Sequence, residues 1–202
     1  MTDPAIVPIV EGQSECESVP VLLRRLLNRR AAHHVRIGKP IRVKRLQVVR
    51  ASQLERAIEL ARRTRHDCAA MLVLLDADDD DPDQLRVELQ DRADKATDVP
   101  VAVVLAVREF EAWFLAAKES LRGTRGIVQH AAAPPAPENI RGAKEALSKN
   151  MQDRNYLEID DQPALTSVFD LETASTRCPS FQRLVSELDR LLTRLPGGNQ
   201  GG

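Results

Sequence analysis

The chain has 202 residues, 43% of them hydrophobic and only 3% aromatic, so we expect one α/β domain with an aliphatic core and a modest extension. No run approaches the roughly 18 uncharged apolar residues that a membrane span needs. The three cysteines are odd in number and far apart, which excludes a disulfide framework and a zinc knuckle. The start lacks the basic region and cleavage pattern of a signal peptide, so we expect a cytoplasmic protein.

The net charge of -1 conceals an uneven distribution of charge. Residues 1–66 carry 14 Lys and Arg against 6 Asp and Glu, whereas residues 67–119 carry 5 against 14. Ten basic residues and no acidic residue lie between positions 18 and 54. This pattern is typical of a surface that contacts a phosphate backbone, although a solvated face or a docking face for an acidic protein would have the same composition. The candidate nucleic-acid contacts are Arg24, Arg25, Arg42, Lys44, Arg45 and Arg50.

Short apolar runs alternate with amphipathic segments over residues 1–122. The runs predict strands, and the segments between them predict helices, so the order is β–α repeated four times. That order predicts a mainly parallel, Rossmann-like sheet with helices on both faces. The expected strands are 5–10, 41–49, 69–75 and 99–107. The expected helices begin near residue 14 or 18, at 52, at 82 and at 109.

The remaining chain predicts less regular structure. Residues 123–137 are rich in Ala and Pro and indicate a loop or linker. Residues 138–195 contain two helical patches, 138–151 and 180–195, around a polar middle, and we expect them to form a helical extension packed on the domain. Residues 196–202 are expected to be disordered.

Acidic side chains follow three of the expected strands. Since the carboxyl ends of parallel strands meet at one edge of a sheet, these acids are expected to gather there. Crowded carboxylates are commonly neutralised by Mg²⁺ or Mn²⁺, which shares its other positions with water and substrate phosphate. The expected metal ligands are Glu11, Asp76, Asp78 and Asp80. The strand at 99–107 is followed by Glu109 and Glu111.

The acidic run allows other interpretations. Asp79, Asp81 and Asp83 fit a solvated helix N-terminus, which favours negative charge. An EF-hand loop is a poor fit, because Asp81 replaces its turn glycine and Val87 its closing glutamate. A receiver-type phosphoacceptor also fits poorly, since no fifth strand supplies a lysine.

The motifs IVEGQSE and LLDADDD, after the first and third strands, resemble the Toprim domain of topoisomerases, primases and OLD-family nucleases. The stretches EFEAWFLA, DQPALTSVFDLETA and CPSFQRL resemble a narrower group of small, stand-alone Toprim-like proteins. That group has long been classed as a domain of unknown function and is often encoded beside AAA-type ATPases. The resemblance runs from Ile6 to about Leu192.

The resemblance implies roles for particular residues. Glu11 would be the acid/base or metal-linked glutamate, and Asp76 and Asp78 the Mg²⁺ ligands. Glu111, two positions before a tryptophan, would be the second catalytic glutamate, while Glu109 fits a helix N-terminal charge equally well. The chain lacks the tyrosine-bearing domain of topoisomerases, so hydrolysis by metal-activated water is the reaction that remains.

The sequence-based prediction is a Mg²⁺-dependent nuclease that cleaves nucleic acid without sequence preference, as the effector of an ATPase-coupled defence system. Its expected protein partner is an AAA/OLD-type ATPase, and a homo-oligomer is compatible with the sequence. A second hypothesis is a non-catalytic subunit that docks on an ATPase or on RNA. A third is a phosphotransfer domain with Asp76 as nucleophile. The roles of Asp161 and Asp170, at the site or as helix caps, stay open.

Overall fold

The computed structural model describes residues 3–50 and 52–195. In that part of the chain, parallel pairing joins the strands into one sheet. Strand β1 pairs with β4 along one edge, and β4 pairs with β5. The other edge of β1 pairs with two short strands, β2 and β3. The strands are β1 (Ala5–Val10), β2 (Arg36–Ile37), β3 (Ile41–Arg42), β4 (Cys68–Asp76) and β5 (Val101–Ala106).

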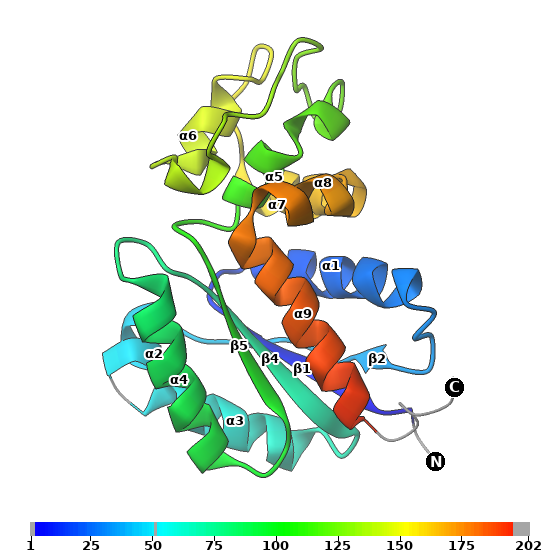
Figure 1. The fold of residues 1–202 in the computed structure, drawn as a ribbon, viewed down its shortest axis with the longest axis vertical. Coiled ribbons are helices and arrows are strands. Elements are labelled where there is room, and N and C mark those ends of the chain that lie inside the picture. Colours follow the sequence, from blue (N-terminus) through cyan, green and yellow to red (C-terminus); the bar gives the residue numbers. More distant parts are fainter. Residues whose placement is uncertain (1–2, 51, 196–202) are drawn as a thin grey trace.

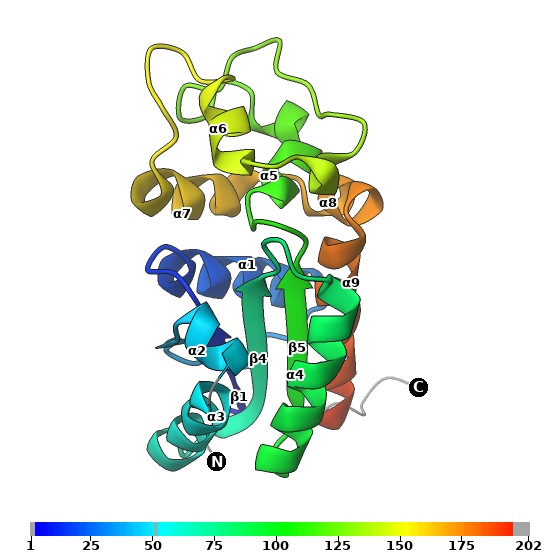
Figure 2. The same cartoon turned by 90° about the vertical axis from the view of Figure 1, so that its left-hand side faces the viewer.

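Helices cover both faces of the sheet, which confirms the predicted α/β class (Figures 1 and 2). Alternate residues of β1 point to opposite faces, as the pleat requires: Ile6 and Val10 pack in one cluster, Val7 and Ile9 in the other. The first face is covered by α1 (Glu15–Arg29) and α9 (Pro179–Arg194). The second is covered by α2 (Arg45–Arg50), α3 (Gln53–Thr64) and α4 (Pro82–Ala96).

The C-terminal part of the chain lies beyond the carboxyl ends of β4 and β5, toward which both arrows point in Figure 2. Helix α7 packs along α1, and α9 then returns along the sheet beside β5. The extension, which we call the roof, therefore covers the edge of the sheet at which the acidic residues lie. Its elements are α5 (Ala112–Ala116), a 3₁₀ turn (Lys118–Leu121), a second such turn (Pro137–Asn139), α6 (Ala143–Ser148), α7 (Glu158–Val168) and α8 (Leu171–Arg177).

The prediction of one strand over residues 41–49 was wrong. Only Ile41 and Arg42 pair with β1, because β1 itself ends at Val10 and offers no partner further on. Beyond that point the chain turns into α2, which buries Val48 completely and leaves Leu46 exposed. A continued strand would have placed Val48 and Leu46 on the same face.

The segment 123–137 has little regular structure, as predicted, but it is anchored to the core. Ile127 and Ala131 are buried, and Ile127 forms an antiparallel bridge with Met151. The helix expected at 138–151 is confined to α6, because Gly142 adopts a left-handed conformation immediately before it. The expected polar middle contains α7 and α8. Residues 196–202, predicted to be disordered, lie outside the described residues.

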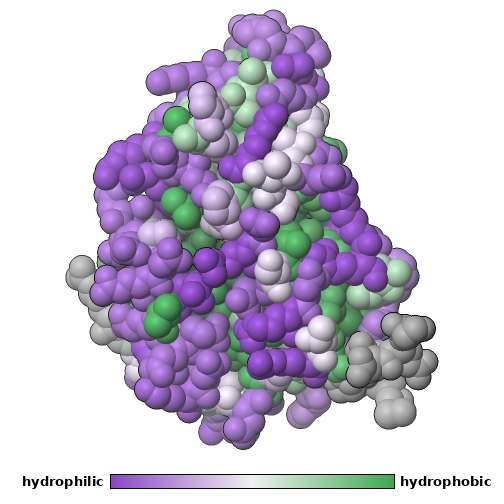
Figure 3. Space-filling view, viewed as in Figure 1, coloured by the Kyte–Doolittle hydropathy of each residue, from purple (hydrophilic) through white to green (hydrophobic). Residues whose placement is uncertain are grey.

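Aromatic side chains concentrate where the extension meets the sheet. Trp113 and Phe114 are fully buried, and they make edge contacts with Phe181 and Phe169. The face drawn in Figure 3 is predominantly hydrophilic, with hydrophobic side chains in small groups. Within the described ranges, no helix is long and apolar enough to cross a membrane.

Candidate carboxylate site at the carboxyl edge of the sheet

Glu11 and Asp76 stand at the ends of neighbouring strands. Val10 is in register with Leu74 of β4. Glu11, the next residue, therefore lies about level with Leu75, one residue before Asp76. The strand order reverses between β1 and β4, because β2 and β3 lie on one side of β1 and β4 and β5 on the other. In open parallel sheets, ligands bind outside the strand ends at such a switch point.

Asp76 ties the end of β4 to the loop after β5. Its Oδ1 accepts a hydrogen bond from the backbone N–H of Phe110 at 2.9 Å. Burial raises the pKa of Asp76 well above its usual range, and the nearby carboxylates of Glu111 and Glu15 raise it further. A buried carboxyl group among other carboxyl groups prefers to hold a proton unless a cation is present.

Glu11 has a similar environment. Burial raises its pKa to about 7, with further contributions from the Asp78 and Glu15 carboxylates. Asp78 adopts a left-handed backbone conformation at φ 50°, which is uncommon outside glycine and marks a constrained turn after β4. At neutral pH the Glu11 carboxyl group is therefore poised to accept or release a proton.

Glu15 is a member of this cluster that the sequence patterns did not single out. It lies in the first turn of α1 and is only 8% exposed. Its carboxylate folds back over Gly12: a Cβ at that position would lie 2.0 Å from Glu15 Oε2. Glycine after Glu11 thus makes room for a second acid. Burial raises the pKa of Glu15, and its Oε2 has no hydrogen-bond partner among residues 3–50 and 52–195.

Glu111 is completely buried under the roof. The Tyr156 hydroxyl donates to its Oε1 at 2.9 Å and Gln162 Nε2 donates to the same atom at 3.1 Å. Its Oε2 has no hydrogen-bond partner within the part of the chain that the structure describes. Burial raises the pKa of Glu111 to about 7, and the charge of Lys144 opposes that rise. The sequence motif identified Glu111 as a candidate but gave no indication of these two donors.

Lys144 supplies the positive charge at the centre of the cluster, and the sequence analysis missed it. It comes from α6, and its Nζ donates to Glu158 Oε2 at 2.6 Å. Burial lowers the pKa of Lys144, but the charges of Glu111 and Glu158 outweigh this and hold it above the usual range. Its charge also acts on Asp76 and Glu11. A lysine about 70 residues beyond the strand motif carries no local signal for this role.

Ser14 connects the same network to the start of α1. Its hydroxyl donates to Glu158 Oε1 at 2.5 Å, and it makes no side-chain cap on α1. Ser14, Glu158 and Lys144 therefore bridge the N-terminal motif to α7 and α6. The roof is part of the site and not a separate appendage.

The rest of the acidic run has other partners. Arg45 forms ion pairs with Asp80 and, at 3.4 Å, with Asp78, and it donates to the carbonyl oxygens of Asp76 and Ala77 at 2.9 Å each. Asp81 caps α4 by accepting from two backbone N–H groups, as expected of a helix N-terminal acid. Asp80 is thus engaged with Arg45 and half-exposed, away from the buried cluster.

The predicted basic contacts fall into two groups. Arg25 donates to the carbonyl oxygens of Thr166 and Phe169 at the end of α7, Arg42 donates to that of Glu11, and Arg45 holds the acidic loop. These three stabilise the fold around the site. Arg24 and Lys44 are exposed, and no hydrogen bond or ion pair holds them among residues 3–50 and 52–195. The side chain of Arg50 lies outside the described residues.

The structure shows the roles of two residues, Asp161 and Asp170, which the sequence left open. Asp161 is completely buried and pairs with Arg125 and Arg154, which ties α7 to the loop before α6 and the one after it. Asp170 caps α8 by accepting from the N–H of Thr173 at 2.6 Å. Both are structural residues of the roof.

The chemistry of the cluster fits a hard divalent cation. Carboxylates are the ligands that Mg²⁺ and Mn²⁺ prefer, and Glu15 and Glu111 each have one carboxylate oxygen without a hydrogen-bond partner among the described residues. Burial raises the pKa of Glu11 and of Glu111 to about 7, so both carboxyl groups are poorly solvated. However, no set of three or more His, Cys, Asp or Glu side chains is arranged to hold a metal ion in the described part of the chain. Among the described residues, Lys144 and Arg45 supply positive charge that acts on Glu11.

The fold and this cluster define a Rossmann-like α/β protein with a buried carboxylate site at its topological switch point. Residues 10–189 match the family described as Domain of unknown function (DUF4276), and the chain belongs to that family. No curated protein and no solved structure matches it.

Proposed function

We propose that this protein is a metal-dependent nuclease of Toprim type. The observation that carries the proposal is the position of Glu11 and Asp76 at the ends of neighbouring strands at the switch point, where the charges of Glu15 and Glu111 also act. The likeness of IVEGQSE and LLDADDD to the Toprim motifs supports the same reading.

In this proposal Glu11, Asp76 and Asp78 would hold Mg²⁺ or Mn²⁺. The ion, when bound, stabilises the negative charge that develops on a phosphoryl group. Glu11, as a carboxylate, would take the proton of the water that attacks the phosphodiester. The P–O bond to the leaving strand would then break, and the departing oxygen would take up a proton from water. Tyr156 and Gln162 fix the orientation of Glu111, and Lys144 offsets the charge of the carboxylates around it.

The partners that we propose are a nucleic acid and an AAA/OLD-type ATPase. Arg24 and Lys44 provide exposed positive charge on the basic segment, suited to a phosphate backbone. An ATPase partner follows from the Toprim-like resemblance and would make the protein the effector of a defence system.

A non-catalytic subunit is the second candidate, favoured by one observation. Lys144 already neutralises part of the cluster, and the described carboxylates are not arranged as a set of metal ligands. A non-catalytic protein that docks on an ATPase or on RNA would not need a set of metal ligands.

Cleavage assays separate the two candidates. The purified protein, alone and with the product of a neighbouring ATPase gene, is incubated with plasmid, single-stranded DNA and RNA in Mg²⁺ or Mn²⁺. The nuclease proposal expects cleavage that Glu11→Gln abolishes. Glu17→Gln is the matched control, because Glu17 is an exposed acid in the first turn of α1, close to Glu11 in the sequence. Cleavage that persists at the wild-type rate in Glu11→Gln would contradict the proposal, as would binding without any cleavage in every combination.

A further inference from the structure

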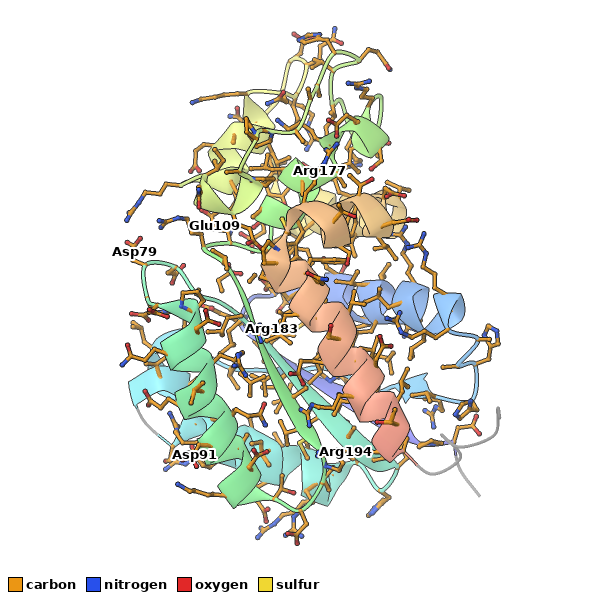
Figure 4. The ribbon with its side chains drawn as sticks, viewed as in Figure 1. Asp79, Asp91, Glu109, Arg177, Arg183 and Arg194 are labelled. Carbon is orange, nitrogen blue, oxygen red and sulfur yellow. The ribbon has the colours of Figure 1, made fainter. Side chains whose placement is uncertain are left out.

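A small cavity adjoins the carboxylate site on its outer side. It has a volume of about 170 Å³ and is lined by Asp78, Asp79, Arg108, Glu109, Arg141 and Gly142. Asp79 and Glu109 lie near each other at one margin of the molecule, on the loops after β4 and β5 (Figure 4). Asp78 belongs to both places, since its charge acts on Glu11.

Two arginines from distant parts of the chain converge on one carboxylate in this cavity. Arg108 Nη1 lies 3.0 Å from Asp79 Oδ1. Arg141 Nη2 lies 2.8 Å from the same oxygen, and Arg141 Nη1 donates to Oδ2 at 3.3 Å. Arg141 thus binds the carboxylate through both of its terminal nitrogens, the geometry in which guanidinium groups also bind phosphate.

The other acids of the cavity have partners of their own. Asp78 lies 3.4 Å from Arg45, and Glu109 Oε1 accepts from the N–H of Ala143 at 3.3 Å. Asp79 is therefore the anion that Arg108 and Arg141 share. Asp79 is 68% exposed and Arg141 71%, and ion pairs of that exposure are weak. An incoming phosphate, with more charge and more acceptor oxygens, can displace such a carboxylate.

The backbone holds the two loops in fixed relation. Arg108 adopts φ 63° and Asp78 φ 50°, both in the left-handed region. The N–H of Asp78 donates to the carbonyl oxygen of Arg108 at 3.0 Å, and that of Ala77 donates to Ala106 at 2.8 Å. A conformation that is costly for arginine persists here because the neighbouring loop fixes it. The site for an anion is thereby formed before the anion arrives.

We infer that Arg108 and Arg141 form a subsite for a phosphate of the nucleic acid, and that Asp79 occupies this subsite while no nucleic acid is bound. The inference rests on the proposed function for the identity of the polyanion. The subsite adjoins the proposed catalytic carboxylates through Asp78, which lines the cavity and whose charge acts on Glu11.

Binding without divalent cations tests the subsite separately from cleavage. The probe is a single-stranded oligodeoxynucleotide of mixed sequence with a fluorescein at its 3′ end, followed by anisotropy in EDTA. Asp79→Asn should bind about five- to tenfold more tightly than the wild type, because it frees both guanidinium groups. Arg108→Gln combined with Arg141→Gln should bind more weakly, and the slope of log affinity against log salt should fall by about 0.7 for one phosphate lost.

Asp83→Asn is the matched control for charge. Asp83 is also exposed and pairs with a single arginine, Arg183, at 3.5 Å, so the change in net charge is the same. If Asp79→Asn binds no more tightly than Asp83→Asn, the subsite is refuted. The same holds if Asp79→Asn still tightens binding when Arg108 and Arg141 are both glutamine.

The two proposals fail independently in this design. Cleavage that depends on Glu11, with wild-type binding and cleavage in the arginine double variant, removes the subsite and leaves the nuclease. Tighter binding by Asp79→Asn with no cleavage by any variant leaves the subsite and removes the nuclease. A 5′-phosphorylated probe that binds more tightly than its 5′-hydroxyl form, only while both arginines are present, assigns the subsite to a terminal phosphate. Equal affinities of the two forms assign it to an internal phosphodiester.

Discussion

The hydroxyl of Tyr156 donates a hydrogen bond to Oε1 of Glu111 at 2.9 Å, and both side chains are buried. The Tyr156 hydroxyl is therefore not exposed to act as a nucleophile on a nucleic-acid strand. Burial and the Glu111 carboxylate both raise the pKa of Tyr156, which keeps the phenol protonated and a hydrogen-bond donor. The pair joins the motif after β5 to the C-terminal roof. The role of Tyr156 is therefore to orient the carboxyl group of Glu111.

Replacing Glu111 by glutamine should make the folded state less sensitive to pH. The pKa of Glu111 is raised from 4.5 to about 7, so the folded protein binds a proton that the unfolded chain releases between those values. Stability is therefore full below about pH 4.5 and falls as the pH rises to about 7, by about 3 kcal/mol for this group. Glutamine keeps an acceptor for Tyr156 and Gln162 but carries no charge.

Denaturant unfolding at about pH 5 and pH 8 measures this effect. We expect Glu111→Gln to match the wild type at the lower pH and to exceed its stability at the higher. Glu109→Gln, two residues away and half-buried, is the control. A Glu111→Gln variant that is less stable than the wild type at both values would show that the carboxylate is stabilised by its surroundings.

Mg²⁺ or Mn²⁺ should raise the melting temperature, and more so at higher pH. The Glu11 and Asp76 carboxyl groups, whose pKa values are raised by burial, must lose their protons to bind a cation, so metal and protons compete. Stabilisation of about 2.7 kcal/mol is expected at a metal concentration one hundred times the Kd.

Asp76→Asn tests where the metal binds. Asparagine retains the acceptor for the Phe110 N–H but has lost the charge, so the response to metal should disappear. Asp91→Asn, an exposed acid on α4 paired with Lys95, should respond as the wild type does. An undiminished metal response in Asp76→Asn would place the ligands elsewhere.

Replacing Lys144 by methionine should destabilise the protein chiefly at high pH. Lys144 offsets the charges of Glu111, Glu158 and Asp76 when these are ionised, and has less to offset when they are protonated. We expect a loss of about 2 kcal/mol at pH 8 and a smaller loss at pH 5. Lys149→Met, an exposed lysine following the same helix, should have little effect at either pH. Equal losses for Lys144→Met at both values would assign the lysine to packing alone.

Substitutions at the neighbouring residues Lys44 and Arg45 should have different effects, on nucleic-acid binding and on stability respectively. Arg45 is only 10% exposed and donates to the carbonyl oxygens of Asp76 and Ala77, so Arg45→Gln should cost about 2–3 kcal/mol of unfolding free energy. Lys44 is exposed, so Lys44→Gln should leave stability unchanged and weaken nucleic-acid binding in a salt-dependent manner. Chemical unfolding and anisotropy on both variants measure the two effects. A Lys44→Gln variant with unaltered affinity between about 50 and 200 mM salt would exclude this residue from the interface.

The sequence by itself determined the sheet and the edge at which to look. Unbroken apolar runs predict β4 and β5, because buried parallel strands have this pattern. Helical crossovers make the strands parallel, so the acids that follow them lie at one edge of the sheet. Local patterning also placed Asp81 at a helix N-terminus, because capping acts within a few residues.

Only the tertiary structure decided which charges meet. Lys144, Glu158 and Tyr156 reach the strand edge because α6 and α7 fold over it, and Asp80 is withdrawn because Arg45 binds it from α2. The residues 41–49 became a short strand and a helix because β1 ends at Val10 and offers no further partner. Burial and the proximity of charges arise from contacts between residues far apart in the chain, and these set the pKa of Glu11, which no local pattern encodes.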